Sequence, residues 1–203
     1  MSIQIKISKK RIPYKKAMFF LNKRVEQVKK GENKELIWIL EHSKVYTGGV
    51  SFNKNEIIDK KIKIIETNRG GKITLHNPGQ IIVYFVLDLN NRKKDIRKLI
   101  NSIEFSIIEF LKILKINSRK DKNNVGIWVD EKKIAAIGLR VSRWVAFHGF
   151  SLNISNNLKE YLKIRPCGLD NTKITSVFNE KKYIPKNFKQ KLLKILVKNI
   201  NKI

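Results

Sequence analysis

The sequence predicts an α+β fold in which a mixed β-sheet is flanked by helices. Apolar runs of strand length alternate along the chain with segments whose apolar residues recur at helical spacing. These strands and helices follow one another without the regular period of a parallel α/β fold. The 203 residues contain no internal repeat and no linker-like segment. We therefore expect one domain over residues 1–203.

The first 40 residues are expected to hold two strands and a helix. Residues 3–7 alternate isoleucine with polar side chains, which is typical of an edge strand. Pro13 is placed to open the helix and Gly31 to end it. The short apolar run over residues 36–40 predicts a buried strand. The apolar face of the helix consists of Tyr14, Met18, Leu21, Val25 and Val28.

The next segment places a glycine-bracketed sequence between two strands. Residues 41–50 are expected to form a loop, since two adjacent glycines let the backbone bend or approach a ligand. Residues 62–66 predict a strand. Residues 68–80 read NRGGKITLHNPGQ, which predicts a hairpin or a loop folded over a site. The long apolar run over residues 81–89 predicts a central strand.

The second half of the chain repeats the alternation of helix and strand. Apolar residues at helical spacing predict a helix over residues 96–114. Residues 125–129 and 133–140 are expected to form two strands joined by a turn, and residues 144–154 a third. The remaining predictions are a helical turn at 157–162 and a basic amphipathic helix opened by Pro185.

The net charge is +27, from 44 basic and 17 acidic residues. Such a charge attracts polyanionic partners, such as nucleic acid or an acidic protein. The lysines are not gathered into a tail or one helix, however, and isoleucine is equally over-used, which favours compositional drift for most of the excess. A nucleic-acid-binding module would account for the charge, but it would leave the segments around Lys133 and Cys167 without a purpose.

Targeting signals and a membrane span are not expected. The first ten residues, MSIQIKISKK, lack the apolar core of a signal peptide. The longest apolar run, IIVYFVL, is far too short to cross a bilayer. The single cysteine cannot form an internal disulfide, which is typical of a reducing compartment. We therefore expect a cytoplasmic protein.

Cys167 and Lys133 are the candidate catalytic residues. Cys167 lies between Pro166 and Gly168, so we expect a turn that exposes the sulfur, although a lone cysteine is commonly a small buried residue. Lys133 precedes the apolar and small residues 134–138, which fits either an edge lysine or a pocket lysine. A neighbouring cation that lowers the pKa of a thiol from ~8.5 makes it a thiolate at neutral pH. This pair predicts an acyl-transfer site.

The histidines offer alternatives to this chemistry. His148 could activate Cys167 in a Cys-His dyad, which would indicate a hydrolase. His76, in the glycine-bracketed segment, fits a site role and a structural role equally well, and His42 fits a structural role better. The spread of three histidines and one cysteine gives no metal-binding spacing, and no P-loop or dinucleotide fingerprint is present. We expect neither a metal nor a cofactor.

Several ordered segments resemble the octanoyltransferases of lipoate biosynthesis, the LipB family. They read EHSKVYTGG, RGGKITLHNPGQ, GIWVDEKKIAAIG, FHGFSLNI and RPCG, between residues 41 and 176. The resemblance implies a catalytic domain of the fold shared by lipoate and biotin ligases. It also implies that Cys167 carries the acyl group as a thioester and that Lys133 lowers its pKa. The implied acyl-binding residues are Arg69, Gly70, Gly71, Lys72, Ile73, Thr74, Leu75, His76, Ala136, Ile137, Gly138, Gly149, Phe150 and Ser151.

The implied reaction moves an octanoyl group from octanoyl-acyl carrier protein to a lysine of a lipoyl domain. The acceptors would be the lipoyl domains of 2-oxoacid dehydrogenases and the glycine cleavage H protein. Related ligases use ATP and lack the nucleophilic cysteine, so Cys167 favours transfer from a preformed thioester. The chain departs from the family at Leu75, where tyrosine is usual, and at Asn77, where glycine is usual; both could alter substrate preference. We expect a monomer that binds neither nucleic acid nor a membrane.

Overall fold

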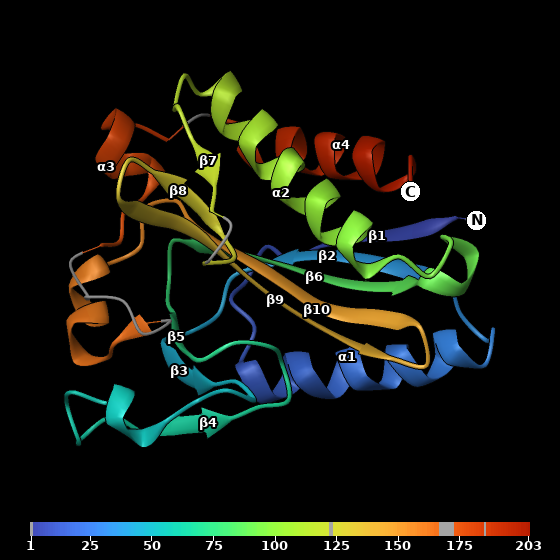
Figure 1. Cartoon of the computed structure of the whole chain (residues 1–203), viewed down its shortest axis with the longest axis horizontal. Helices are drawn as coiled ribbons and strands as arrows, with labels where there is room; N and C mark the ends of the chain where they lie inside the picture. The colour runs from blue at the N-terminus through green and yellow to red at the C-terminus, as the bar shows by residue number, and fades with distance from the viewer. Residues whose placement is uncertain (1, 122–123, 167–172, 185) are drawn as a thin grey trace.

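The computed structural model describes residues 2–121, 124–166, 173–184 and 186–203. In these residues two β-sheets lie among helices, with a large sheet through the middle of the molecule (Figure 1). The predicted α+β class with a mixed sheet and flanking helices is confirmed. No helix in the described ranges is long and apolar enough to cross a membrane.

The large sheet has seven strands in the order β1-β2-β6-β10-β9-β8-β7. β1 pairs with β2 in parallel, and the other neighbours are antiparallel, so the sheet is mixed. β6 is an interior strand, as its apolar run predicted. In sheet order the strands are β1 (Ile3–Ile7), β2 (Glu35–Leu40), β6 (Gln80–Asp88), β10 (Val145–Asn153), β9 (Lys132–Ser142), β8 (Ile127–Val129) and β7 (Arg119–Lys120).

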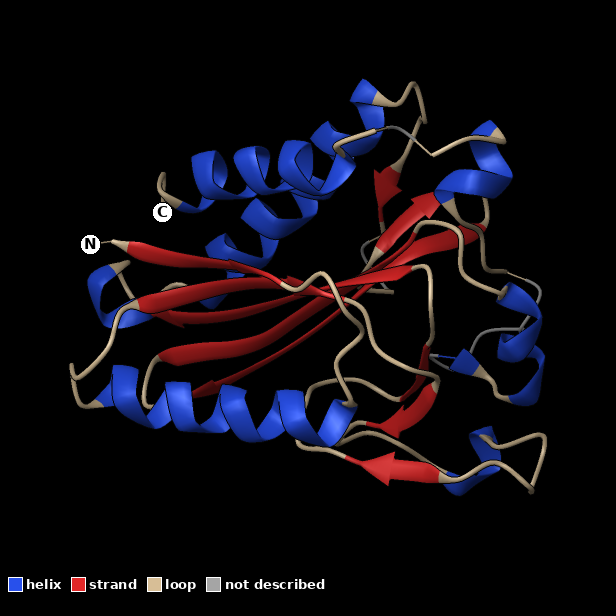
Figure 2. Ribbon diagram, turned by 180° about the vertical axis from the view of Figure 1, so that it is seen from behind, coloured by secondary structure: helices blue, strands red, loops and turns tan. Residues whose placement is uncertain are grey.

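Helices cover the two faces of the large sheet. α1 (Tyr14–Lys29) lies along one face, whereas α2 (Ile96–Ile113) and α4 (Phe188–Ile200) lie together on the other (Figures 1 and 2). The apolar face of α1 packs on Trp38 and Tyr84, while α2 and α4 pack on Phe85 and Phe150. Each face therefore has its own hydrophobic core, and burial of apolar area there is the main stabilising term.

A smaller sheet of three strands, in the order β4-β3-β5, lies beside α1. Its strands are β3 (Val45–Gly48), β4 (Ile64–Glu66) and β5 (Ile73–His76). The prediction of a loop over residues 41–50 was therefore wrong for β3. β5 pairs antiparallel with β3, with His76 opposite Val45, so the glycine-bracketed segment is not a local hairpin. The short β3 escaped prediction because its partners are distant in sequence.

Short 3₁₀ turns connect several elements, and besides β3 two further short elements were not predicted. The turns are η1 (Lys54–Glu56), η2 (Leu89–Asn91) and η3 (Leu158–Lys163), the last at the predicted helical turn. β7 consists of two exposed basic residues, and α3 (Val177–Lys181) spans only five, so neither has a detectable apolar period. Ser176 caps α3 by accepting a hydrogen bond from the Asn179 N–H. Pro185, expected to open α4, lies outside the described residues.

Candidate active site

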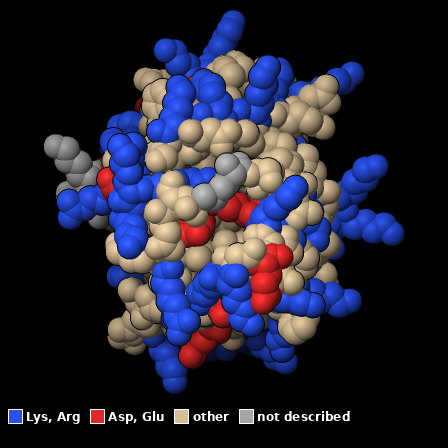
Figure 3. Space-filling model, turned by 90° about the vertical axis from the view of Figure 1, so that its right-hand side faces the viewer, with Lys and Arg blue, Asp and Glu red and all other residues tan. Residues whose placement is uncertain are grey.

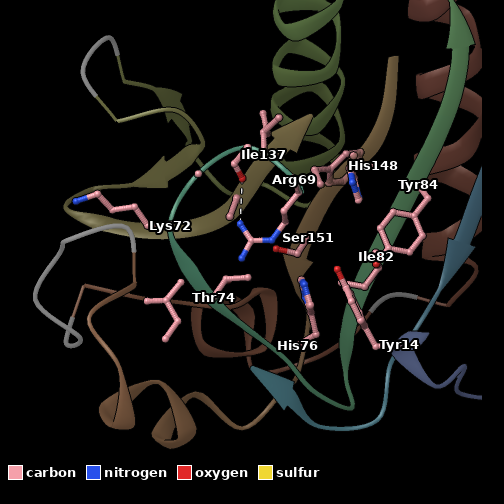
Figure 4. Close-up of a pocket in the computed structure, with 17 residues that line it drawn as sticks. Tyr14, Arg69, Lys72, Thr74, His76, Ile82, Tyr84, Ile137, His148 and Ser151 are labelled. Atoms are coloured by element: carbon pink, nitrogen blue, oxygen red, sulfur yellow. Dashed lines mark hydrogen bonds between the residues drawn. The ribbon is translucent and has the colours of Figure 1, made fainter. Parts of the chain in front are cut away.

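A pocket lies between the α1 face of the large sheet and the segment Arg69 to Thr74, which forms its roof (Figure 4). It holds about 530 Å³ of empty space, including the part open to solvent. All the predicted acyl-binding residues except Leu75 line it. Four further lining residues were not predicted as acyl-binding: Tyr14, Ile82, Tyr84 and His148.

The floor of the pocket comes from three neighbouring strands. In the antiparallel register, Ser151 of β10 lies opposite Ile82 of β6 and Ala136 of β9. Two residues earlier in β10, Gly149 lies opposite Tyr84 of β6 and Gly138 of β9. Opposed residues share a face of a sheet, so these six positions form two rows beneath the roof.

Glycines let the chain approach closely at this floor. A Cβ atom on Gly149 would lie 1.9 Å from the Val83 carbonyl oxygen, so a larger residue would force β6 and β10 apart. A Cβ atom on Gly138 would lie 3.0 Å from the carbonyl oxygen of Gly70 in the roof. Gly149 thus allows the close pairing of β6 and β10, whereas Gly138 sets the distance between the floor and the roof of the pocket.

The roof is held mainly by Arg69. Its Nη2 donates to the carbonyl oxygen of Thr47 at 2.7 Å and to Thr47 Oγ1 at 2.9 Å, and its Nη1 donates to the Gly70 carbonyl at 3.0 Å. Lys72 points away from the other labelled side chains (Figure 4) and forms a 3.4 Å ion pair with Glu56. Both cations therefore shape the roof.

Two histidines and two tyrosines pack at the side of the pocket covered by α1. His42 donates from Nδ1 to the Ile12 carbonyl at 2.6 Å, so its Nε2 accepts the Tyr84 hydroxyl at 2.8 Å. His76 Nδ1 lies 2.8 Å from Gln80 Oε1. The Tyr14 ring stacks on His76 with ring centres 6.1 Å apart. These contacts hold the aromatic side of the pocket rigid.

The histidines at the pocket are neutral at physiological pH. Burial lowers the pKa of His42 to about 4. Burial, and then the nearby His42, lower the pKa of His76 to about 3. Burial and the positive charges of Arg69 and Arg140 lower the pKa of His148 to about 4. None of the three is therefore a strong general base at neutral pH.

Lys133 lines a separate small cavity next to this pocket. Its side chain is buried, with the residue 4% exposed, and Nζ donates to the Val125 carbonyl at 3.2 Å. Its backbone is fixed by hydrogen bonds to Lys173 and Thr175. In the described part of the chain, no carboxylate forms an ion pair with this ammonium. The other residues around the cavity are Thr74, Ala135, Ala136, Ser151, Asn153, Tyr161, Pro166 and Ile174.

The two cavities share a wall. Thr74, Ala136 and Ser151 line both the larger pocket and the cavity of Lys133. Pro166, which precedes Cys167 in the sequence, lines the cavity of Lys133. Cys167 itself lies outside the described residues. His148 lines the larger pocket but not the cavity of Lys133, and its Nε2 lies 2.8 Å from Asn68 Oδ1. Pro166 therefore shares a cavity with Lys133 and not with His148.

Leu75 is the predicted acyl-binding residue that the structure places elsewhere. Its side chain is fully buried among Tyr46, Ile73, Tyr161 and Ile164. In β5 successive side chains point to opposite faces, so the neighbours Thr74 and His76 face the pocket and Leu75 faces away. The expectation that this departure from the family alters the acyl site is therefore not supported by its position.

The unpredicted lining residues had only weak signals in the sequence. Tyr14 fits the apolar face of a helix, and Tyr84 lies inside a long apolar run, so the sequence predicts a core position for both. The hydroxyl groups of the two tyrosines were the one sequence signal for such a position, because a buried tyrosine hydroxyl usually has a hydrogen-bond partner.

Solved structures of lipoate and biotin ligases have the same fold. A lipoate-protein ligase A bound with ATP superimposes with a TM-score of 0.77 at 14% identity, over 99% of this chain and 86% of that one. A bipartite lipoate protein ligase from Thermoplasma acidophilum gives 0.72 at 14% identity, over 99% and 84%. Biotin protein ligase from Aquifex aeolicus gives 0.54 at 14% identity, over 100% and 69%.

Residues 13–197 match the lipoyl protein ligase A/B catalytic domain, which is the class that the fold also defines. The octanoyltransferase of Bartonella tribocorum is 38% identical over 191 residues, covering 87% of this chain and 78% of that protein. That of Anaplasma marginale is 39% identical over 181 residues, covering 86% and 85%. The chain belongs to the octanoyltransferase family, and it is therefore an acyltransferase.

Proposed function

We propose that the protein transfers an octanoyl group from octanoyl-acyl carrier protein to a lysine of a lipoyl domain, through a thioester on Cys167. Family membership supports octanoyl transfer. The observation that supports the residue assignment is the wall shared by the two cavities. It brings Lys133 and Pro166, the neighbour of Cys167, next to a pocket lined by Ile82 and Ile137, which suits an acyl chain.

In the first half-reaction the Cys167 thiolate attacks the carbonyl carbon of the donor thioester. A new carbon–sulfur bond forms, the bond to the phosphopantetheine sulfur breaks, and that sulfur leaves as a thiol with a proton from Lys133. The buried ammonium of Lys133 favours the thiolate, because a buried cation without a carboxylate partner gains free energy from a nearby anion. The octanoyl chain then occupies the pocket above Ala136 and Gly138.

In the second half-reaction the amine of the acceptor lysine attacks the thioester on Cys167. The amide bond forms, the carbon–sulfur bond to Cys167 breaks, and neutral Lys133 takes the proton that the nitrogen releases. This step restores the thiolate and the ammonium. Two half-reactions through one covalent intermediate give ping-pong kinetics.

The acceptors we propose are the lipoyl domains of 2-oxoacid dehydrogenases and the glycine cleavage H protein. The bipartite ligase of similar fold from Thermoplasma acidophilum was solved as part of a lipoylation system with its E2 lipoyl domain. A cytoplasmic location and a monomeric state stay predictions.

The test is the mass of the intact protein after mixing with octanoyl-acyl carrier protein, without acceptor and without ATP. We expect one added octanoyl group, which disappears when a lipoyl domain is added and is absent in Cys167→Ala. A Cys167→Ala protein that transfers octanoyl at near-normal rates would overturn the mechanism. Transfer that requires ATP and free octanoic acid would indicate a ligase instead.

A further inference from the structure

We infer that Tyr14, together with the hydrogen-bonded pair Asn68 and His148, forms a wall that limits the length of the acyl chain. The inference rests on the proposed function of the larger pocket as the acyl site. It assigns to these three residues the rejection of acyl chains longer than octanoyl. None of them takes part in the proposed covalent steps.

A further cavity, distinct from the cavity of Lys133, lies on the other side of the wall formed by Tyr14, Asn68 and His148. It is a groove between the first half of α1 and the segment from Ile65 to Asn68, with about 900 Å³ of empty space, including the part open to solvent. Met18 and Ile65 give it an apolar component. The groove is lined by Tyr14, Lys15, Met18, Asn22, Ile65, Glu66, Thr67 and Asn68.

Tyr14 separates the two spaces, because it lines both the pocket and the groove. A second connection crosses the wall: Asn68 lines the groove, His148 lines the pocket, and their side chains are joined by a 2.8 Å hydrogen bond. The left-handed backbone of His148, with φ at +64°, is unusual for a non-glycine residue and turns this side chain toward Asn68.

The Tyr14 ring is held in place from two sides. It packs edge-on against His42 with ring centres 5.2 Å apart and stacks on His76 at 6.1 Å. The residue is 6% exposed, and its side chain points into the pocket beside His76 and Ile82 (Figure 4). Such a packed ring cannot swing aside without losing both contacts, so it acts as a fixed barrier.

The wall lies away from the reacting end of the pocket. The cavity of Lys133 joins the pocket at Thr74, Ala136 and Ser151, whereas Tyr14 and His148 line the pocket but not that cavity. An acyl chain bound at that junction therefore extends toward the wall with its methyl end. The groove behind Tyr14 provides room for a longer chain once the wall is opened.

The experiment compares octanoyl- and dodecanoyl-acyl carrier protein as donors, with kcat/KM measured for the full-length wild type, Tyr14→Ala and Tyr14→Phe. We expect Tyr14→Ala to raise the dodecanoyl-to-octanoyl ratio about ten-fold or more, because methylene discrimination in an apolar pocket is of this size. Tyr14→Phe keeps the ring and should keep the ratio. Lys16→Ala, an exposed change on the same helix, should leave octanoyl transfer unchanged.

Asn68→Ala opens the wall at its second point and tests the inference even if Tyr14→Ala fails to fold. We expect a raised ratio there too. An unchanged ratio in folded Tyr14→Ala, or in Asn68→Ala where the former does not fold, would overturn the inference. Wild-type protein that forms no acyl-enzyme with either donor would instead refute the proposed function on which the inference rests.

Discussion

Lys133 Nζ lies 4.8 Å from the centre of the Trp128 ring. A ring face and the Val125 carbonyl stabilise an ammonium without neutralising its charge. The described residues therefore leave a buried positive charge beside the cavity that Pro166 lines. This charge is the physical reason for assigning Lys133 to thiolate formation.

Replacing Lys133 with methionine should slow acyl-enzyme formation about 100-fold or more at pH 7, because the variant loses both the cation and the proton donor. The rate should recover partly as the pH approaches ~8.5, where an ordinary thiol ionises without help. Rapid mixing and quenching, followed by measurement of the mass of the intact protein, gives this rate. Lys132→Met, a change at the exposed neighbour, is the matched control. A Lys133→Met rate equal to wild type at pH 7 would contradict the assignment.

The glycines at 149 and 138 should respond differently to alanine. Gly149→Ala puts a methyl group against the Val83 carbonyl between two interior strands, so we expect a loss of unfolding free energy of at least about 1–3 kcal/mol. Gly138→Ala meets only the roof at Gly70, and we expect a raised KM for the donor with a smaller loss of stability. Urea unfolding and donor kinetics separate the two. Equal stabilities of the two variants would refute this division of roles.

The sequence predicted the elements whose apolar residues follow a clear period, such as α1, α2 and β6. The family resemblance also named most of the residues that line the pocket, although their role in binding stays a prediction. It could not predict that Leu75 faces away, because all four residues of β5 are buried and alternation gives no hint of which face holds the pocket. Tyr14 was missed because helical period predicts a buried side chain and not what it packs against.

Cys167 shows a different limit. Its role was predicted from a turn-like setting and from family resemblance, and it lies outside the described residues. The sequence left Lys133 between an edge lysine and a pocket lysine. The structure buries this residue beside a cavity, while its catalytic role stays a prediction. The distinction depends on the distant segment at Lys173 and Thr175, which pairs with the Lys133 backbone.

The stability of the protein should fall as the pH decreases from 6.5 toward 4. The chain has three histidines, all buried, and their folded-state pKa values lie at about 3 to 4, below the ordinary value of 6.5. The unfolded chain therefore binds more protons in this window, and each histidine lowers the unfolding free energy by up to about 1.4 kcal/mol per pH unit. Above pH 6.5 this contribution is complete.

Urea unfolding at pH 7.5, 6 and 5 measures this dependence, and His148→Gln provides the comparison. The glutamine retains a side-chain hydrogen-bonding group near Asn68 but does not titrate. The slope of unfolding free energy against pH should therefore decrease by up to the contribution of one bound proton. Identical slopes for wild type and His148→Gln would show that His148 is not kept neutral in the folded state.

Salt should weaken the reaction with the carrier-protein donor more than with a small donor. Lysine and arginine side chains are spread over the face shown in Figure 3, whereas the acidic groups gather in its middle and lower part, in keeping with the net charge of +27. If the carrier protein is acidic, as the family resemblance implies, this charge speeds encounter at low ionic strength and is screened as salt is added. We expect kcat/KM for octanoyl-acyl carrier protein to fall between 50 and ~300 mM salt, while that for uncharged octanoyl-pantetheine stays nearly constant. Equal salt dependence for both donors would indicate that the charge is compositional drift with no part in donor binding.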